Sequence, residues 1–370
     1  MSQPRLARSQ VLDILRAVAI LLVFSRHTGL PPFSMAGWAG VDLFFVLSGF
    51  LVSGLLFREY RESGRVRSAR FLLRRGFKIY PQFYLLILLT LVLSPLTGLR
   101  GRGAKFAAEV FFVQNYFPGL WGHTWSLAVE EHFYLLLAAV IGLLSRRGGE
   151  DPFQPLARWI PVVFGAVLLF RIATYAHDPL WSYYRNLYPS HLRIDSLLAG
   201  VLLSYYHVYR GPSLAAFVSR HRAWLARVSL LLLAPAAVLD QSRAFIYTFG
   251  FTMLWAGFAL LLLIALYPQR RSVRRPGRGG RTLAALGRVS YAFYLWHIPV
   301  IQLTDWAQSR YRAASLAMVL ASPILAFFVT LAIAFLTTWA LEAPLLRLRD
   351  RLVPSGLRAP LVVAGPATGA

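Results

Sequence analysis

The chain contains 370 residues, of which 57% are hydrophobic, and its formal net charge is +24 at pH 7. Its mean hydropathy is +0.54, and its apolar content exceeds the roughly 45–50% of soluble domains, which excludes an ordinary soluble fold. The absence of cysteine excludes disulfides, a thiol nucleophile and thiolate metal ligands, and the sequence indicates no other metal site.

Apolar segments recur along the whole chain, at lengths near the ~20 residues that cross a bilayer. They predict an all-α integral membrane protein with about ten transmembrane helices in one bundle. We expect a cytoplasmic segment at residues 1–10, one transmembrane domain at 11–345 and a cytoplasmic tail at 346–370, disordered at its end. The expected spans lie at approximately residues 11–29, 39–57, 79–98, 124–144, 159–176, 191–209, 226–240, 245–267, 284–304 and 315–340.

Positive charge gathers in short stretches between these segments, at 58–78, 145–147, 210–227, 269–281 and 347–351. Ten spans with a cytoplasmic N-terminus place all of these stretches, and the C-terminus, on the cytoplasmic side, where Arg and Lys collect. The basic loop at 100–105 is an exception that falls on the outer side. In a soluble protein this charge would suggest nucleic acid, but here we expect membrane lipid headgroups as partners and no nucleic acid.

Residues 15–29, LRAVAILLVFSRHTG, form an apolar stretch that nevertheless carries Arg16, Arg26 and His27. Ionisable side chains inside a span are costly and therefore point to function. Arg16 and His27 are eleven positions apart, which returns a helix to nearly the same face with about 16 Å between them along the axis. Asp13, three residues before Arg16, can pair with it. The alternative is that Arg16 snorkels and His27 packs at the outer interface.

The segment GHTWSLAVEEHFYL (122–135) carries a second polar pattern. Ser126, Glu130 and Tyr134 follow one another at i, i+4 and i+8, which places them in one stripe on a helix. Glutamates at the outer end of a span can simply be interfacial, but this stripe is expected to face other helices rather than lipid.

Two later spans also contain polar groups. HLRIDSLLAG (191–200) contains Arg193 and Asp195, which we expect either to neutralise each other or to hold separate partners, with a structural role favoured for Arg193. SYAFYLWHIPV (290–300) places Tyr294 and His297 in an apolar helix. A lone histidine in such a helix is usually a packing residue, so His297 ranks below His27 as a functional candidate.

Six blocks of the sequence resemble one known family. LDILRAVAILLVFSRHTG resembles the first helix of the membrane acyltransferase family 3, with its Arg followed by ten residues and a His. The later blocks of that family are similar, in the same order, to GVDLFFVLSGFLVSGLL (40–56), RRGFKIYPQFY (74–84), TWSLAVEEHFYL (124–135), RIDSLLAG (193–200) and SYAFYLWHIP (290–299). Together the blocks span the chain from about residue 10 to 345, and their order makes the resemblance specific.

The resemblance implies transfer of an acyl group, most often acetyl from acetyl-CoA, to a hydroxyl of a carbohydrate, glycolipid or other cell-envelope acceptor. It implies a multi-pass protein of the bacterial cytoplasmic (inner) membrane in which His27 and Arg16 are essential. There are two departures. In the first, the family's Arg-x-x-Arg pattern is here Arg75 followed by Lys78, and lysine meets a phosphate only as a point charge. The family commonly has Gln at the position of His132, to which we assign no role.

Acyl-CoA carries several phosphates and needs a basic mouth, which Arg16, Arg74, Arg75 and Lys78 are suited to form. A neutral imidazole at His27 is suited to removing a hydroxyl proton or to accepting the acyl group itself. No metal is expected. The candidates to orient His27 are Glu130 and Asp13, and those for substrate binding are Ser126, Arg193, Asp195, Tyr294 and His297.

The sequence also allows other mechanisms and other classes of membrane protein. Among the mechanisms of an enzyme, the one in which Ser126 is the nucleophile is the least favoured. A transporter or flippase of a lipid-linked glycan would use the buried charges as a pathway, but the inverted repeats typical of transporters are not evident. A non-catalytic membrane scaffold would explain the hydropathy but not the six blocks.

Overall fold

The computed structural model describes residues 4–31, 33–97, 103–268, 277–310 and 316–355. These residues form helices and connecting turns, with no strand among them. The α-helices are α1 (Pro4–Thr28), α2 (Gly40–Ser63), α3 (Ser68–Thr97), α4 (Gly103–Val110), α5 (Trp125–Ser145), α6 (Gln154–His177), α7 (Ile194–Tyr209), α8 (Gly211–Val238), α9 (Phe251–Leu266), α10 (Arg278–Arg288), α11 (Ser290–Arg310), α12 (Leu316–Thr337) and α13 (Ala343–Leu352).

Several of these helices can cross a membrane by length and composition. Six such stretches occur in the described part of the chain: Gly37–Ser63, Ser68–Ser94, Gly122–Ser145, Gln154–His177, Ile246–Leu266 and Ser322–Leu352. The all-helical class and the membrane character expected from hydropathy are therefore confirmed. The expected spans near 11–29, 191–209, 226–240 and 284–304 are largely helical but are not among the six, so the total of about ten spans and the placement of the termini remain predictions.

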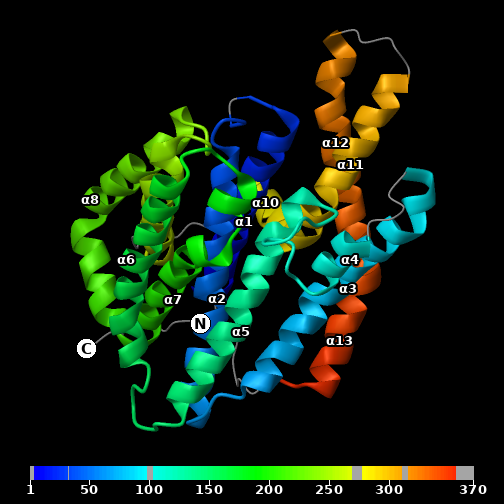
Figure 1. The fold of residues 1–370 in the computed structure, drawn as a ribbon. Helices are drawn as coiled ribbons and strands as arrows, with labels where there is room; N and C mark the ends of the chain where they lie inside the picture. The colour runs from blue at the N-terminus through cyan, green and yellow to red at the C-terminus, as the bar shows by residue number, and fades with distance from the viewer. Residues whose placement is uncertain (1–3, 32, 98–102, 269–276, 311–315, 356–370) are drawn as a thin grey trace.

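The helices are arranged around α1 and α2 (Figure 1). The helices α6, α7 and α8 lie on one side of this pair, and α3, α11, α12 and α13 lie on the other. The helices α2 and α7 approach each other closely, so that a Cβ atom at Gly49 or Gly200 would overlap the backbone of the opposite helix. Glycines at both positions therefore let the two backbones touch.

Two buried ion pairs connect α7 and the turn before it to neighbouring helices. Arg171 of α6 contacts Asp195 at 2.6 Å, Arg193 contacts Asp42 of α2 at 2.7 Å, and these side chains are at most 1% exposed. Arg193 and Asp195 thus hold separate partners, which is one of the two arrangements expected from the sequence. Removing one member of a buried pair leaves the other charge uncompensated and typically costs about 3–5 kcal/mol.

The boundaries of two expected spans differ from the helices of the structure. The segment expected at 226–240 is only the second half of α8, which begins at Gly211. The segment expected at 284–304 is divided at Val289 into α10 and α11. The first residues of the expected tail are helical, as the last part of α13, and residues 356–370 lie outside the described residues, so the boundary at residue 345 stays a prediction.

Candidate active site

Three neighbouring cavities follow one another through the bundle, and we name them by their linings. The basic cavity, of 340 Å³, is lined among others by Glu59, Arg70, Phe71, Arg74, Arg75, Lys78 and Arg349. The central cavity, of 140 Å³, is lined among others by Arg16, Val41, Phe44, Ser48, Leu51, Arg75, Lys78, Ser126, Glu130, Tyr134, Tyr291 and Tyr294. The histidine cavity, of 340 Å³, is lined among others by Arg26, His27, Trp38, Val41, His123, Trp125, Tyr188, Arg193, Gln241, Tyr294 and Gln302.

Each cavity shares walls with the next. Arg75 and Lys78 line both the basic and the central cavity, and Val41 and Tyr294 line both the central and the histidine cavity. Along α2, the series extends from Val41 to Glu59, which is about 27 Å at 1.5 Å per residue. This length is close to the ~30 Å thickness of a bilayer's hydrocarbon core.

Most cations of the basic cavity already have a carboxylate partner. Arg74 contacts Asp350 at 2.9 Å, and Lys78 forms an ion pair with Glu342, whose other oxygen accepts a hydrogen bond from Gln82 at 2.8 Å. Lysine at position 78 therefore balances a buried carboxylate as well as facing the cavity.

Arg75 is different from its neighbours. Among the described residues it forms no ion pair, and its guanidinium lies over the rings of Tyr134, at 5.5 Å, and Phe71, at 5.9 Å. Such cation–π contacts hold the group in place without neutralising it. Because Arg75 lines two cavities at once, its charge is available to an anion that occupies either one.

The stripe of Ser126, Glu130 and Tyr134 does line one cavity, the central one. The Tyr134 hydroxyl donates to Glu130 at 2.6 Å, so the Ser48 hydroxyl, 2.7 Å away, donates to Tyr134. Arg16 lines the same cavity and pairs with Asp13 at 3.5 Å, which confirms the pairing expected from their spacing.

The structure does not bring the two proposed orienting carboxylates to His27. Asp13 precedes it by fourteen residues on α1, or about 21 Å along the axis, and contacts Arg16 instead. Glu130 accepts from Tyr134 in the central cavity, whereas His27 lines the histidine cavity. Arg16 and His27 likewise line different cavities of the series.

Three imidazoles gather at the histidine cavity. The ring centroids of His27 and His297 are 5.1 Å apart, and those of His297 and His123 are 5.2 Å apart. His27 is exposed, whereas the other two rings are buried. His123 is a residue that the sequence analysis missed, although it stands three residues before Ser126 in the same motif.

Backbone contacts fix the tautomers of the two buried rings. A carbonyl oxygen only accepts, so His297 donates through Nδ1 to Tyr294 at 2.5 Å, and His123 donates through Nε2 to Leu295 at 3.1 Å. The remaining nitrogens, Nε2 of His297 and Nδ1 of His123, are buried without a hydrogen-bond partner among the described residues. Each is therefore a free acceptor for a hydroxyl or an N–H group.

A buried carboxylate holds the turn that carries His123. Glu109 of α4 is fully buried and accepts from the backbone N–H groups of Leu120, at 2.9 Å, and Trp121, at 3.0 Å, and from the Thr124 hydroxyl. These hydrogen bonds offset the cost of burying the carboxylate, so that it needs no cation beside it. They fix the short turn Gly122–Thr124 and, with it, the backbone of His123.

The remaining predicted residues lie at the edges of this site. Arg193 lines the histidine cavity, and its Nε and Nη1 have no partner in the described part of the chain. Asp195 lines none of the three cavities and is held by Arg171 and the Trp255 indole. His132 contacts Ser190 at 2.7 Å. No group of three or more His, Asp or Glu side chains suited to a metal ion occurs among the described residues.

Comparison with known proteins places this arrangement in a family. An acyltransferase-domain family model matches residues 10–342, which is nearly the whole chain, and the chain belongs to that family. It is 29% identical over 312 residues to an O-acetyltransferase OatA of Staphylococcus aureus. It is 27% identical over 319 residues to a peptidoglycan O-acetyltransferase OatA of Listeria monocytogenes.

These alignments cover most of this chain but only part of each relative. They include 78% and 79% of this chain, and 50% and 49% of the two relatives. The chain therefore spans about half the length of the curated relatives it matches. No solved structure matches the chain.

Proposed function

We propose that this protein is a membrane O-acetyltransferase that moves an acetyl group from cytoplasmic acetyl-CoA to a hydroxyl of a cell-envelope polysaccharide. The observation that carries the proposal is the series of three cavities, with uncompensated cationic charge at one end and a cluster of imidazoles at the other. The names of the relatives, an O-acetyltransferase and a peptidoglycan O-acetyltransferase, support the acyl group and the acceptor class.

The basic cavity is the proposed site for the phosphates of the donor. Its cations lie on the side of the bundle where the basic stretch 58–78 joins α2 to α3, and such stretches favour the cytoplasm. Arg75 is the best placed to bind a phosphate because it has no carboxylate partner among the described residues, and a guanidinium offers a bidentate fork. Arg74 and Lys78 contribute positive charge once a donor phosphate displaces the carboxylates of Asp350 and Glu342 from them.

The central cavity then holds the pantetheine arm and directs the thioester toward His27. A neutral His27 accepts the proton of the acceptor hydroxyl while the oxygen of that hydroxyl attacks the carbonyl carbon of the thioester. The new C–O bond forms, the C–S bond breaks, and the CoA thiolate takes up the proton to leave as free CoA. In the two-step variant, a nitrogen of His27 carries the acetyl group before the hydroxyl receives it.

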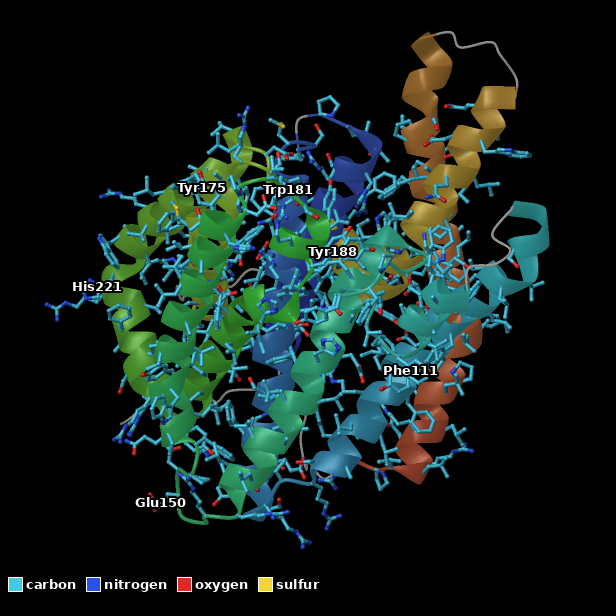
Figure 2. The ribbon with its side chains drawn as sticks, in the orientation of Figure 1. Phe111, Glu150, Tyr175, Trp181, Tyr188 and His221 are labelled. Carbon is cyan, nitrogen blue, oxygen red and sulfur yellow. The ribbon has the colours of Figure 1, made fainter. Side chains whose placement is uncertain are left out.

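The histidine cavity is the proposed acceptor site. Its aromatic lining includes Trp38, Trp125 and Tyr188, of which Tyr188 is labelled in Figure 2, and suits the apolar faces of a sugar ring. Trp125 and Tyr188 stack with 5.0 Å between centroids, which gives a rigid platform. Arg193 adds N–H donors for sugar oxygens, and His297 and His123 add acceptors for its hydroxyls.

The test uses the protein in proteoliposomes loaded with acetyl-CoA whose acetyl group is radiolabelled, with polysaccharide or peptidoglycan fragments outside. Transfer of label to an ester on the outer fragments is expected. A transporter would instead move glycan without forming an ester. The proposal would be contradicted if the label stayed on CoA with every acceptor that is supplied. Mass spectrometry of envelope polysaccharides with and without the gene then identifies the acceptor.

A further inference from the structure

One wall separates the central cavity from the histidine cavity. Of the residues that line these two cavities, Val41 and Tyr294 line both. Tyr294 is buried at 7% exposure, and its ring packs against Phe44, with 6.2 Å between centroids, on the central side and against His123, at 5.6 Å, on the other. The ring therefore stands between the space in front of Arg75 and the space that contains His27.

Two hydrogen bonds lock this ring in position. The Tyr294 hydroxyl donates to the carbonyl oxygen of His123 at 2.6 Å, and the Ser126 hydroxyl, 2.7 Å away, consequently donates to Tyr294. Both partners are themselves fixed, because His123 and Ser126 belong to the turn and first residues of α5 that Glu109 holds. A buried tyrosine held at both its ring and its hydroxyl is a rigid wall rather than a swinging gate.

We propose that the Tyr294 ring selects the length of the transferred acyl group. The inference rests on the proposed function, in which acyl-CoA enters the central cavity from the basic side. In that orientation the carbon atoms beyond the thioester carbonyl point toward the wall and meet the Tyr294 ring before the carbonyl reaches His27. In this proposal the room beside the ring admits the methyl group of an acetyl donor, and a longer chain collides with the ring.

The size of the expected discrimination follows from packing. One methylene too many in a tight apolar pocket typically changes kcat/KM by roughly ten- to 200-fold, and a rigid wall gives little relief from overpacking. Butyryl-CoA carries two methylenes more than acetyl-CoA. We expect the wild-type protein to prefer acetyl-CoA over butyryl-CoA by at least about tenfold in kcat/KM.

Three variants isolate the wall. Tyr294→Ala joins the two cavities and is expected to raise the ratio of butyryl to acetyl kcat/KM by about tenfold or more. Tyr294→Phe keeps the ring and loses only the hydroxyl, so its ratio stays near that of the wild type even if its absolute rate falls. Leu51→Ala enlarges the central cavity at a point about 15 Å from Val41 along α2, away from the wall. It leaves the ratio of butyryl to acetyl kcat/KM unchanged.

The readout is the ratio of two donors, so it does not depend on how much of a variant is folded. Binding of non-reactive acetyl and butyryl thioether analogues of CoA gives the same comparison for a variant that no longer turns over. A wild type without preference, or a Tyr294→Ala protein whose ratio and analogue preference match those of the wild type, overturns the inference. Failure of the proposed function is distinct, because the wild type would then transfer no acyl group from either donor.

Discussion

His27 on α1 and His297 on α11 lie with 5.1 Å between their ring centroids, and neither imidazole has a carboxylate within ion-pair distance among the described residues. His27 is exposed to the histidine cavity, whereas His297 is fully buried and tied to the Tyr294 carbonyl. Of the two rings, His27 is therefore the one that is accessible from the cavity, whereas His297 is held in place and offers as an acceptor only its Nε2, which has no partner among the described residues.

His27→Ala is expected to lower acetyl transfer by at least about 10²-fold, since a positioned acid or base contributes roughly 10²–10⁴ to a rate. Folding and membrane insertion should be retained because His27 lines a cavity and its neighbours on α1 provide the packing. The matched control is His221→Ala, which removes an exposed histidine on the outer side of α8, away from the three cavities (Figure 2). Near-normal turnover in an inserted His27→Ala protein would remove His27 from the reaction.

Arg75→Ala is expected to raise the KM for acetyl-CoA by roughly ten- to a hundredfold, with a smaller effect on the KM of the acceptor. The reason is the loss of one charge-assisted phosphate contact, worth about 1.5–3 kcal/mol. Arg74→Ala is the control, because Asp350 already balances Arg74, and its effect should be several times smaller. A titration of acetyl-CoA at fixed acceptor measures both, and equal effects would contradict the special role of Arg75.

Lys78→Ala should raise the KM for the donor and also destabilise the protein. It leaves the carboxylate of Glu342, whose side chain is 5% exposed, without its cation, at a cost of about 1–3 kcal/mol. Lys78→Arg restores a guanidinium at this position and should be tolerated or improve donor binding.

The double variant Lys78→Ala/Glu342→Gln separates the two roles of Lys78. Thermal unfolding in detergent should return toward that of the wild type, while the KM for acetyl-CoA stays raised if Lys78 contacts a phosphate. Recovery of both quantities would show that Lys78 serves only to balance Glu342.

Cysteine labelling tests the sidedness on which the donor assignment depends, and the chain has no native cysteine. Gly64 is a poor position because its φ is 67°, which a cysteine rarely adopts. Arg65→Cys, one residue later and exposed, should resist an impermeant reagent applied to intact cells. Arg243→Cys, exposed beside Asp240, should react. The reverse pattern would invert the topology and move the donor to the other side.

Arg26 and Asp240 join the end of α1 to the turn after α8, with 2.6 Å between Nη2 and Oδ2. Partial burial acts to raise the pKa of Asp240, but hydrogen bonds from Ser242 and the charge of Arg26 outweigh it and hold the pKa below its usual value. A carboxyl group with a lowered folded-state pKa adds stability above the unfolded-state pKa of about 3.9, and this contribution disappears as the pH falls through the folded-state pKa.

Asp240→Asn is therefore expected to destabilise the protein by about 0.2–1 kcal/mol at pH 5–7, since both side chains are partly exposed. The difference from the wild type should shrink toward zero below about pH 4. Thermal unfolding of both proteins in detergent from pH 3 to 7 measures it. A difference that stays constant down to pH 3 would show that the asparagine acts by something other than the lost charge.

The sequence by itself determined the class of fold and the contents of single helices. Runs of apolar residues near the length of a bilayer crossing favour helices, because a helix in lipid satisfies its backbone hydrogen bonds internally. The helical period placed Ser126, Glu130 and Tyr134 along one cavity and Asp13 beside Arg16. It did not place the helix ends well. Hydropathy missed the first half of α8, because a helix continues through charged residues that extend to the membrane surface.

Only the tertiary structure decided which helices face one another, and with that the site. The contacts between Lys78 and Glu342, between Arg193 and Asp42, and between Tyr294 and His123 join residues far apart in the chain. Spacing along one helix contains no information about such partners, because they depend on how close two backbones approach and on which faces meet. For the same reason the motif GHTWSLAVEEHFYL did not indicate His123 as a site residue. Its place in the site follows from His27 of α1 and His297 of α11, which lie beside it only in the folded chain.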